Sequence, residues 1–257
     1  LTITGGVTKI ASNVTTLGSQ SYADIMLAPT NSGTTNLTST NANISLLGKV
    51  DSVTDKTQSL SINAGTANIV IGDSIGSVAR FNELTATANK IYVLADILTA
   101  QTQTFNGAIL IGDASYLGKT PTTGFLFQAH YIPYFQYHSG NAVSGIDYLD
   151  TNPIYIRTLI SQDPVITFNG TINDVVPNTH TLLLAAIAPS VPANNAVTIN
   201  AAANINFMAT VGEIAPLYSL NAQTVLNSVV ANSASTYLGS ITVTGGVSTY
   251  SSQYYRA

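Results

Sequence analysis

Residues 166–172 read Ile-Thr-Phe-Asn-Gly-Thr-Ile, and this short stretch carries the pattern that decides the fold. Ile166 and Phe168 flank Thr167, and Asn169-Gly170 closes the run. An apolar residue at every second position is typical of a β-strand with one buried face, and Asn and Gly favour the turn that ends it. The stretch therefore predicts a short strand followed by a turn.

The same alternation recurs along the whole chain. Pairs of apolar residues two positions apart stand at Leu1/Ile3, Ile44/Leu46, Leu60/Ile62, Ile69/Ile71, Ile109/Ile111, Leu182/Leu184, Val197/Ile199, Ile205/Phe207 and Ile241/Val243. Strong helix formers such as Glu, Lys and Arg are scarce, and only Val225–Ala234 is compatible with a short helix. The sequence predicts an all-β fold.

The composition excludes several classes of protein. Of 257 residues, 34 are Thr, 24 Ser and 23 Asn, but 45% are hydrophobic, which is too many for a disordered chain. Eight basic residues and a net charge of −4 argue against binding to nucleic acid. No apolar stretch is long enough for a membrane-spanning helix, so we expect no membrane insertion. The absence of Cys excludes disulfides and thiolate chemistry and fits an exported protein.

Three blocks of the chain align with later blocks in the same order. Residues 1–27 align on 84–110, 44–64 on 166–186, and 67–88 on 203–224. These alignments predict one segment, 1–257, with repeat units 1–83, 84–219 and a partial unit 220–257, and with insertions at about 111–165 and 187–202. The last 38 residues also fit a second registration, because Ile241–Val247 copies Leu1–Val7.

A repeat that tolerates long insertions favours a solenoid over tandem sandwich domains. Each coil of a solenoid contacts only its neighbours, so an insertion loops out at one corner without disturbing the stack. Inward Val, Ile, Leu and Phe fit stacked parallel coils. The small Asn, Thr and Ser residues suit the corners, where their side chains bond the backbone or form ladders.

Three runs resemble the repeats of filamentous-haemagglutinin-like bacterial surface proteins. They are Gln103-Thr104-Phe105-Asn106-Gly107-Ala108, residues 166–172, and Leu60-Ser61-Ile62-Asn63-Ala64-Gly65. The resemblance covers roughly 1–110 and 165–257. It implies a right-handed parallel β-helix, export across a Gram-negative envelope, and adhesive or structural work. Since the chain starts without Met or a signal peptide, we interpret it as a mature product or an internal piece of a longer polypeptide.

No residue pattern predicts a catalytic, cofactor-binding or metal site. The one local group of acids, Asp147, Asp150 and Asp163 with His138 and Arg157 nearby, falls in the first predicted insertion and matches no acid/base or ligand spacing. His180 aligns with Gln58, which indicates a corner residue. A polysaccharide-cleaving β-helix enzyme therefore remains only as an alternative function.

Aromatic residues gather in the first predicted insertion. A candidate contact patch comprises Tyr131, Tyr134, Phe135, Tyr137 and Tyr148. Tyr buries much area at small entropic cost and keeps a polar group, so these side chains suit recognition of glycans or proteins. The alternative is that they pack the insertion onto the flank of the stack.

The sequence thus predicts a non-enzymatic structural or adhesive stalk segment of a large secreted or surface-exposed protein, at the cell surface of, or outside, a Gram-negative bacterium. The competing interpretation is a subunit of an extracellular filament or sheath. Exposed coil ends are open strand edges, which pair with further strands. The expected partners are therefore neighbouring repeats or end-to-end copies of the chain, together with cell-surface or matrix glycans or proteins.

Overall fold

The computed structural model describes residues 1–28, 33–118, 154–159, 165–188, 200–201, 203–226, 236–237 and 239–257. Strands make up about half of these residues; a single 3-10 turn, η1 (Ala114–Leu117), and no α-helix occurs among them. Every strand pair in this part of the chain is parallel. The all-β class and the parallel pairing predicted from the sequence are confirmed.

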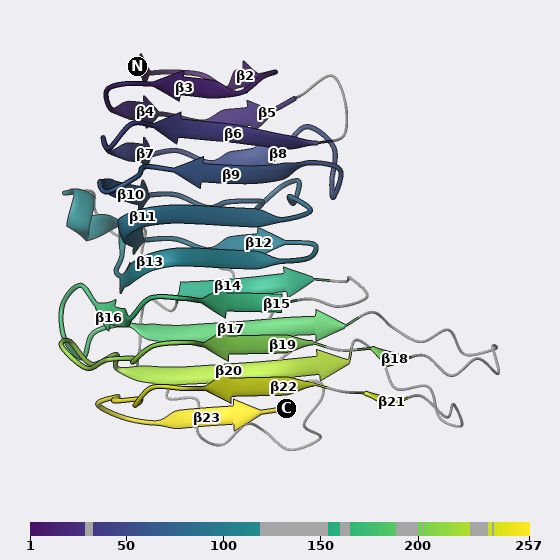
Figure 1. Cartoon of the computed structure of the whole chain (residues 1–257), viewed down its shortest axis with the longest axis vertical. Helices are drawn as coiled ribbons and strands as arrows, with labels where there is room; N and C mark the ends of the chain where they lie inside the picture. The colour runs from purple at the N-terminus through teal and green to yellow at the C-terminus, as the bar shows by residue number, and fades with distance from the viewer. Residues whose placement is uncertain are drawn as a thin grey trace.

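The strands form three ladders that run along the longest axis of the molecule, with the N-terminus at one end and the C-terminus near the other (Figure 1). The first ladder consists of β1 (Thr2–Ile3), β4 (Gln20–Tyr22), β7 (Ile44–Leu46), β10 (Asn68–Ile71), the second halves of β11 (Leu84–Val93) and β13 (Gln103–Ile111), and β16 (Ile172–Asp174).

The second ladder shares two of these strands. It consists of β3 (Val14–Thr16), β6 (Thr34–Ser39), β9 (Ser59–Asn63), the first halves of β11 and β13, β15 (Val165–Phe168), β19 (Asn204–Phe207) and β22 (Ser240–Val243). In β11 the register against β13 shifts between Thr87 and Lys90, so one long strand serves two ladders across a bend.

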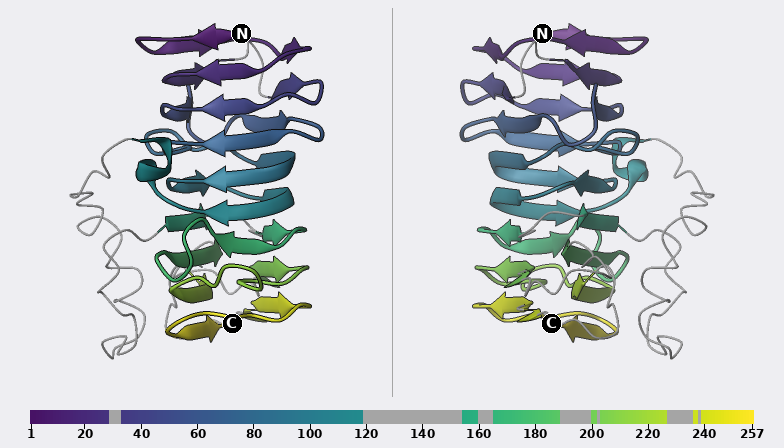
Figure 2. Two further views of the ribbon diagram at one scale, coloured as in Figure 1. Left: turned by 90° about the vertical axis from the view of Figure 1, so that its left-hand side faces the viewer. Right: turned by 90° about the vertical axis from the view of Figure 1, so that its right-hand side faces the viewer.

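The third ladder completes the stack. It consists of β2 (Thr8–Ile10), β5 (Ile25–Leu27), β8 (Val50–Ser52), β12 (Ile97–Thr99), β14 (Ile154–Leu159), β17 (Thr181–Ala188), β20 (Ser219–Leu226) and β23 (Gln253–Arg256), with isolated bridges through Ile75 joining β8 to β12. Apart from the ladders, β18 (Asn200–Ala201) pairs with β21 (Thr236–Tyr237). The chain visits the first, third and second ladders in that order, again and again. Figure 2 shows the resulting coils stacked along the long axis.

One core runs the length of the stack because each ladder turns alternate side chains inward. Ile71, Ile62 and Ile97 represent the three ladders, and all three are fully buried in the same hydrophobic cluster. In the second ladder the rings of Phe105, Phe168 and Phe207 are stacked on consecutive strands. The predicted alternation therefore gives the observed burial.

Small polar side chains at the corners bond the backbone of the next coil, as the sequence predicted. Asn43 Oδ1 accepts a hydrogen bond from Asn68 N at 3.1 Å, and Asp24 Oδ1 accepts one from Lys49 N at 2.8 Å; in both pairs the partners are 25 residues apart. Asn169 Nδ2 donates to Asn106 Oδ1 at 2.7 Å, which forms an amide ladder across two strands. These bonds satisfy polar groups at turns that no strand pairing reaches.

The ladders differ from the predicted alignment of repeats. Leu84 pairs with Leu60 and Gln103 in the second ladder, whereas Thr2, beside the aligned Leu1, pairs with Ser21 in the first. The sequence alignment of residues 1–27 with 84–110 therefore pairs residues of the first ladder with residues of the second. All ladders share the same inward alternation, so composition and period alone do not distinguish them.

The first predicted insertion contains a strand of the stack. Strand β14 lies within 111–165 but pairs with β12 and β17 in the third ladder, and η1 lies at the start of the same range. The long step is visible in the second ladder, where Asn106 and Asn169 bond across adjacent strands although they are 63 residues apart. Where corner bonds join other neighbouring coils, the separation is 25 residues for Asn43 and Asn68.

Candidate functional site

Most of the residues singled out from the sequence lie outside the described residues. This holds for the whole candidate contact patch, Tyr131, Tyr134, Phe135, Tyr137 and Tyr148, and for Asp147, Asp150, Asp163 and His138. Arg157 lies in β14, where its Cα is in register with Leu98 of β12 and Ala185 of β17. It therefore belongs to the stack.

The structure instead brings together two carboxylates and a histidine that the sequence analysis did not group. Asp174 ends β16, and its register partner Ile111 ends β13 on the adjacent strand of the first ladder. Asp113 follows Ile111 by two residues, so both acids emerge at the same edge. The chain then turns through Asn178, which has a positive φ of 65°, and returns to place His180 directly before β17.

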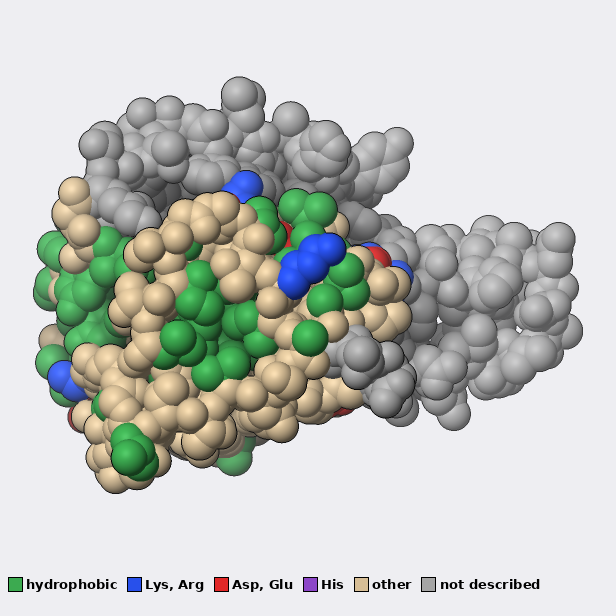
Figure 3. Space-filling model, turned by 90° about the horizontal axis from the view of Figure 1, so that it is seen from above, with side chains coloured by type: hydrophobic (Ala, Val, Ile, Leu, Met, Phe, Trp, Pro, Cys, Tyr) green, Lys and Arg blue, Asp and Glu red, His purple; other side chains and the backbone are tan. Residues whose placement is uncertain are grey.

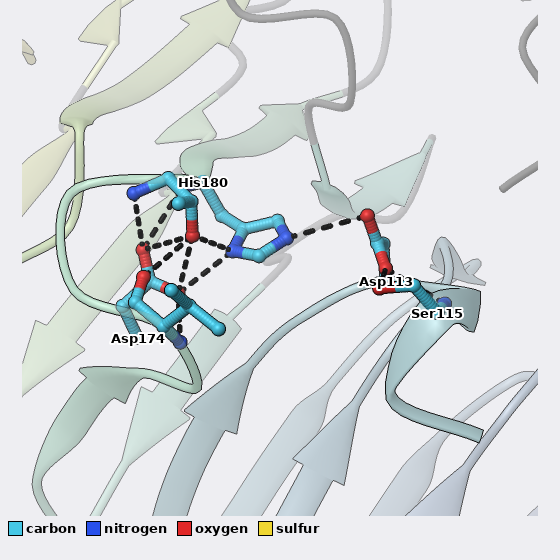
Figure 4. Close-up of polar contacts among 6 residues, drawn as sticks. Asp113, Ser115, Asp174 and His180 are labelled. Atoms are coloured by element: carbon cyan, nitrogen blue, oxygen red, sulfur yellow. Dashed lines mark hydrogen bonds and ion pairs between the residues drawn. The ribbon is translucent and has the colours of Figure 1, made fainter. Parts of the chain in front are cut away.

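Asp174 is the fixed member of this cluster, which we call the Asp113–His180–Asp174 cluster (Figure 4). Its side chain is fully buried, and its Oδ1 atom lies 2.7 Å from His180 Nδ1. Its Oδ2 atom accepts backbone hydrogen bonds from Thr179 N at 3.0 Å and His180 N at 2.9 Å. A carboxylate that receives several donors can be buried in its ionised form.

Asp113 faces the other side of the imidazole. Its Oδ2 atom lies 3.7 Å from His180 Nε2, and its Oδ1 atom accepts hydrogen bonds from the hydroxyl and the backbone N–H of Ser115. Burial by itself raises the pKa of Asp113, but the bonds from Ser115 and the charge of His180 outweigh it and hold the pKa below its usual value. Asp113 is therefore ionised at neutral pH.

The arrangement of this cluster differs from that of a hydrolytic triad. In a hydrolytic triad the imidazole contacts an acid through one nitrogen and a nucleophilic hydroxyl through the other. Here the second nitrogen faces another carboxylate, Asp113. Among the described residues no group of three or more His, Cys, Asp or Glu side chains has the arrangement of a metal site. The geometry supports a buried ionic bridge between two strands.

The segment after Asp113 packs on the outside of the first ladder. The ring of Tyr116 is stacked on that of Tyr92 with centroids 5.0 Å apart. A hydrogen bond with Tyr92 is the main cause that raises the pKa of Tyr116. Leu117 covers Gly72, where an added Cβ would lie 2.7 Å from Leu117 Cδ1. The start of the predicted insertion is thus attached to the flank of the stack.

Sequence reasoning placed His180 at a corner, and the structure confirms that position, with the residue buried before β17. It missed the two acids because their approach depends on the pairing of β13 with β16. The sequence contains only a weak signal for this grouping. Asp113 and Asp174 each come after a short stretch of β-strand, Ile109–Ile111 or Ile172–Asn173, and only the register between β13 and β16 shows that the two acids are neighbours.

Comparisons of the chain with protein families, with curated protein sequences and with solved structures found no match.

Proposed function

We propose that this chain is a right-handed parallel β-helix and serves as a structural stalk segment of a large secreted or surface-exposed bacterial protein, without enzymatic activity. Three parallel ladders, continued in places by isolated bridges and visited in a constant order around one core, support the solenoid. Such a stack is a stiff rod, since adding coils lengthens it without changing its cross-section.

The observation that carries this proposal is the open state of both end faces of the described stack. Val14 and Ile3 in the first coil, and Ile241 and Val247 in the last, are only partly buried, whereas the equivalent Ile205 inside the stack is fully buried. Figure 3 shows hydrophobic side chains gathered on the N-terminal end face. An open core with unpaired strand edges favours a further parallel coil on it.

The C-terminal end face has the same character. Val243 is 40% exposed although it stands in register with Phe207, which is 1% exposed. Tyr255 of β23 is 39% exposed, while its register partner Ala222 in β20 is fully buried. The inward positions of the last coil therefore lack a neighbour of the kind that covers every interior coil.

The adhesive part of the proposal depends on the predicted contact patch in the first insertion, with cell-surface or matrix glycans or proteins as partners. Its support is that η1, at the start of this predicted insertion, lies on the flank of the stack (Figure 2). Location outside a Gram-negative cell is inferred from the resemblance in sequence. No helix in the described residues has the length and apolar character needed to span a bilayer.

A self-assembling extracellular filament is the second candidate, and the two open end faces favour it. The N-terminal face has the edges of β1, β2 and β3 around an apolar centre, and the C-terminal face has those of β22, β23 and the bridge at Val247, so one copy can extend the ladders of another head to tail. The stalk and the filament differ in what covers the ends: further coils of the same polypeptide, or a second molecule.

Electron microscopy and light scattering over a range of concentrations test both candidates. A filament grows along its axis with a regular repeat, and Val243→Asp, which places a charge on the end face, stops the growth. The matched control is Val78→Asp, because Val78 is 82% exposed on a turn away from the ends. A stalk segment remains monomeric and elongated in all three proteins. Compact particles without a long axis would contradict both candidates.

A further inference from the structure

The Asp113–His180–Asp174 cluster joins β13 and β16, two neighbouring strands of the first ladder that are separated by 60 residues of the chain. Asp113 follows β13, and Asp174 ends β16, its neighbour in the first ladder. Between these two strands the chain passes through η1 and the first predicted insertion and adds β14 and β15. The cluster therefore connects the segment that follows β13 with the end of β16.

The contacts of His180 favour its doubly protonated state. Both ring nitrogens face carboxylate oxygens, Nδ1 at 2.7 Å from Asp174 and Nε2 at 3.7 Å from Asp113. Only a doubly protonated imidazole presents N–H groups at both positions. The side chain of His180 is 8% exposed and those of its partners 0% and 16%, so water screens these charges weakly. This geometry therefore favours an imidazolium between the two carboxylates.

Loss of a proton from the His180 ring affects its contacts with Asp174 and Asp113 unequally. Asp174 keeps its backbone donors Val176 N, Thr179 N and His180 N whatever the state of the ring. A neutral imidazole can keep one N–H toward Asp174, so its unprotonated nitrogen then faces Asp113 and repels that carboxylate. The contact that opens is the one to Asp113, at the start of residues 112–118, which we call the root segment.

We propose that His180 is a proton-operated latch that holds the root segment of the first insertion against the stack and releases it when the imidazolium is neutralised. The root segment has two further attachments, the stacked Tyr116 and the covered Gly72. Release therefore loosens the segment locally, and the ladders stay paired. The proposal concerns the stack itself and holds whether the stack is a stalk or a filament subunit.

The closed state of the latch has a lower pH limit, which depends on Asp113, and an upper pH limit, which depends on His180. The pKa of Asp113 is lower in the folded chain, so its share of the latch is present above the unfolded value and lost as pH falls through the folded one. The share of the imidazolium is present at low pH and lost as the ring is deprotonated. The latch is closed between these limits. Asp113, Asp174 and the neutral hydroxyls of Thr179 and Ser115 are the groups whose contacts in the cluster define this behaviour.

The test uses the full chain with His130→Gln and His138→Gln, both outside the described residues, so that His180 gives the only imidazole signal. NMR follows its protonation, and hydrogen exchange of peptides covering 112–118 is compared at each pH with that of β11, which serves as internal reference. We expect relative protection of the root segment to fall roughly ten-fold as the ring is deprotonated. Protection that stays constant through the NMR titration would overturn the latch.

Two variants separate the latch from a merely structural contact. Asp113→Asn removes the charge that faces Nε2, so the root segment exchanges quickly and without pH dependence around the titration of the ring. Ser115→Ala keeps the charge but removes a hydrogen bond that lowers the pKa of Asp113, so release on the acid side moves to higher pH while the alkaline side is unchanged. A full pH response in Asp113→Asn would equally contradict the proposal.

Discussion

Gly170 illustrates how closely single residues are constrained at a corner of the stack. It lies between β15 and β16, and a Cβ added to it would overlap the backbone of Gly107 and stand 2.9 Å from Ala108 N in the coil before. We expect Gly170→Ala to lower the free energy of unfolding toward the upper end of about 1–3 kcal/mol, because backbone cannot move aside as a side chain can.

Urea unfolding measures this effect, with Gly18→Ala as the matched control. An added Cβ at Gly18 meets nothing within 4 Å, so that variant is expected to stay within about 0.5 kcal/mol of the parent. Equal stability of the two variants would show that the corner at Gly170 is more yielding than its geometry indicates.

Asp55 and Arg80 form a two-point ion pair between consecutive coils. Arg80 Nη2 lies 2.7 Å from Asp55 Oδ2, and Arg80 Nε donates to Asp55 Oδ1 at 3.0 Å. The hydrogen bond from the Arg80 side chain is the main cause that holds the pKa of Asp55 below its usual value. Since the Asp55 side chain is 42% exposed, solvent screening keeps the stabilisation at about 0.5–1 kcal/mol.

Asp55→Asn is expected to lose this stabilisation at neutral pH. A lowered folded pKa gives a contribution that is present above the unfolded pKa and lost as pH falls through the folded one, so parent and variant converge in acid, below the folded pKa of Asp55. Thermal unfolding at several pH values measures the difference. Lys56→Ala is the control, since Lys56 Nζ is 3.9 Å from Asp55 with both side chains exposed. A difference that persists in acid would disprove the ionic origin.

For single residues, the sequence predicted which polar side chains form hydrogen bonds at corners better than it predicted which residues lie close together. It placed Asn, Thr and Ser at the corners, and Asn43 bonds the next coil as expected, with Asp24 in a similar role. It did not bring Asp113 to His180, because that contact depends on which strands are neighbours across the longest step in the chain. Local propensity describes a turn, but not what faces it.

The strands of the second ladder are joined by a column of stacked aromatic rings. Phe105, Phe168 and Phe207 are in register on β13, β15 and β19, with ring centroids 5.3 and 5.7 Å apart and rings within 12° of parallel. Stacked rings at this separation contribute beyond the area they bury. Phe168 has a ring on both sides.

Phe168→Ala is therefore expected to lower the free energy of unfolding by about 3–5 kcal/mol, and Phe168→Leu by less, because Leu refills part of the volume. Chemical unfolding followed by circular dichroism measures both. Ile214→Ala is the control, since Ile214 is 84% exposed and a change there is expected within about 0.5 kcal/mol. A Phe168→Ala loss as small as the control's would mean that the column contributes little.

At the scale of the element, the alternation predicted strands and their inward faces, but not the ladder to which each strand belongs. Leu84 was aligned with Leu1 although the two lie in different ladders, and Ile154–Leu159 was assigned to an insertion although it is strand β14. Period-two patterns are the same on every face of such a stack, so register comes from tertiary pairing.

For the whole molecule, the stack is a one-dimensional arrangement in which each coil contacts only the coils before and after it. Residues 84–102 contribute one visit to each ladder, and Gln103 is the register partner of Leu84 on the next coil. The bonded corner pair Thr87 and Asn106 gives the same step, 19 residues. Removal of 84–102 therefore brings Gln103 to the position that Leu84 holds beside Leu60.

We expect the chain without 84–102 to fold with the same β signal in circular dichroism and to be shorter by one strand spacing, about 4.8 Å, in small-angle scattering. Removal of 84–93 alone is the matched control, because it takes out β11 but leaves β12. A strand of the third ladder then follows in the chain at the point where a strand of the second ladder should come. That smaller deletion is expected to break the ladders and lower the melting temperature far more. If the smaller deletion were tolerated as well as the larger one, the coils would not be the units of this fold, since only a whole circuit preserves the inward register of every later strand.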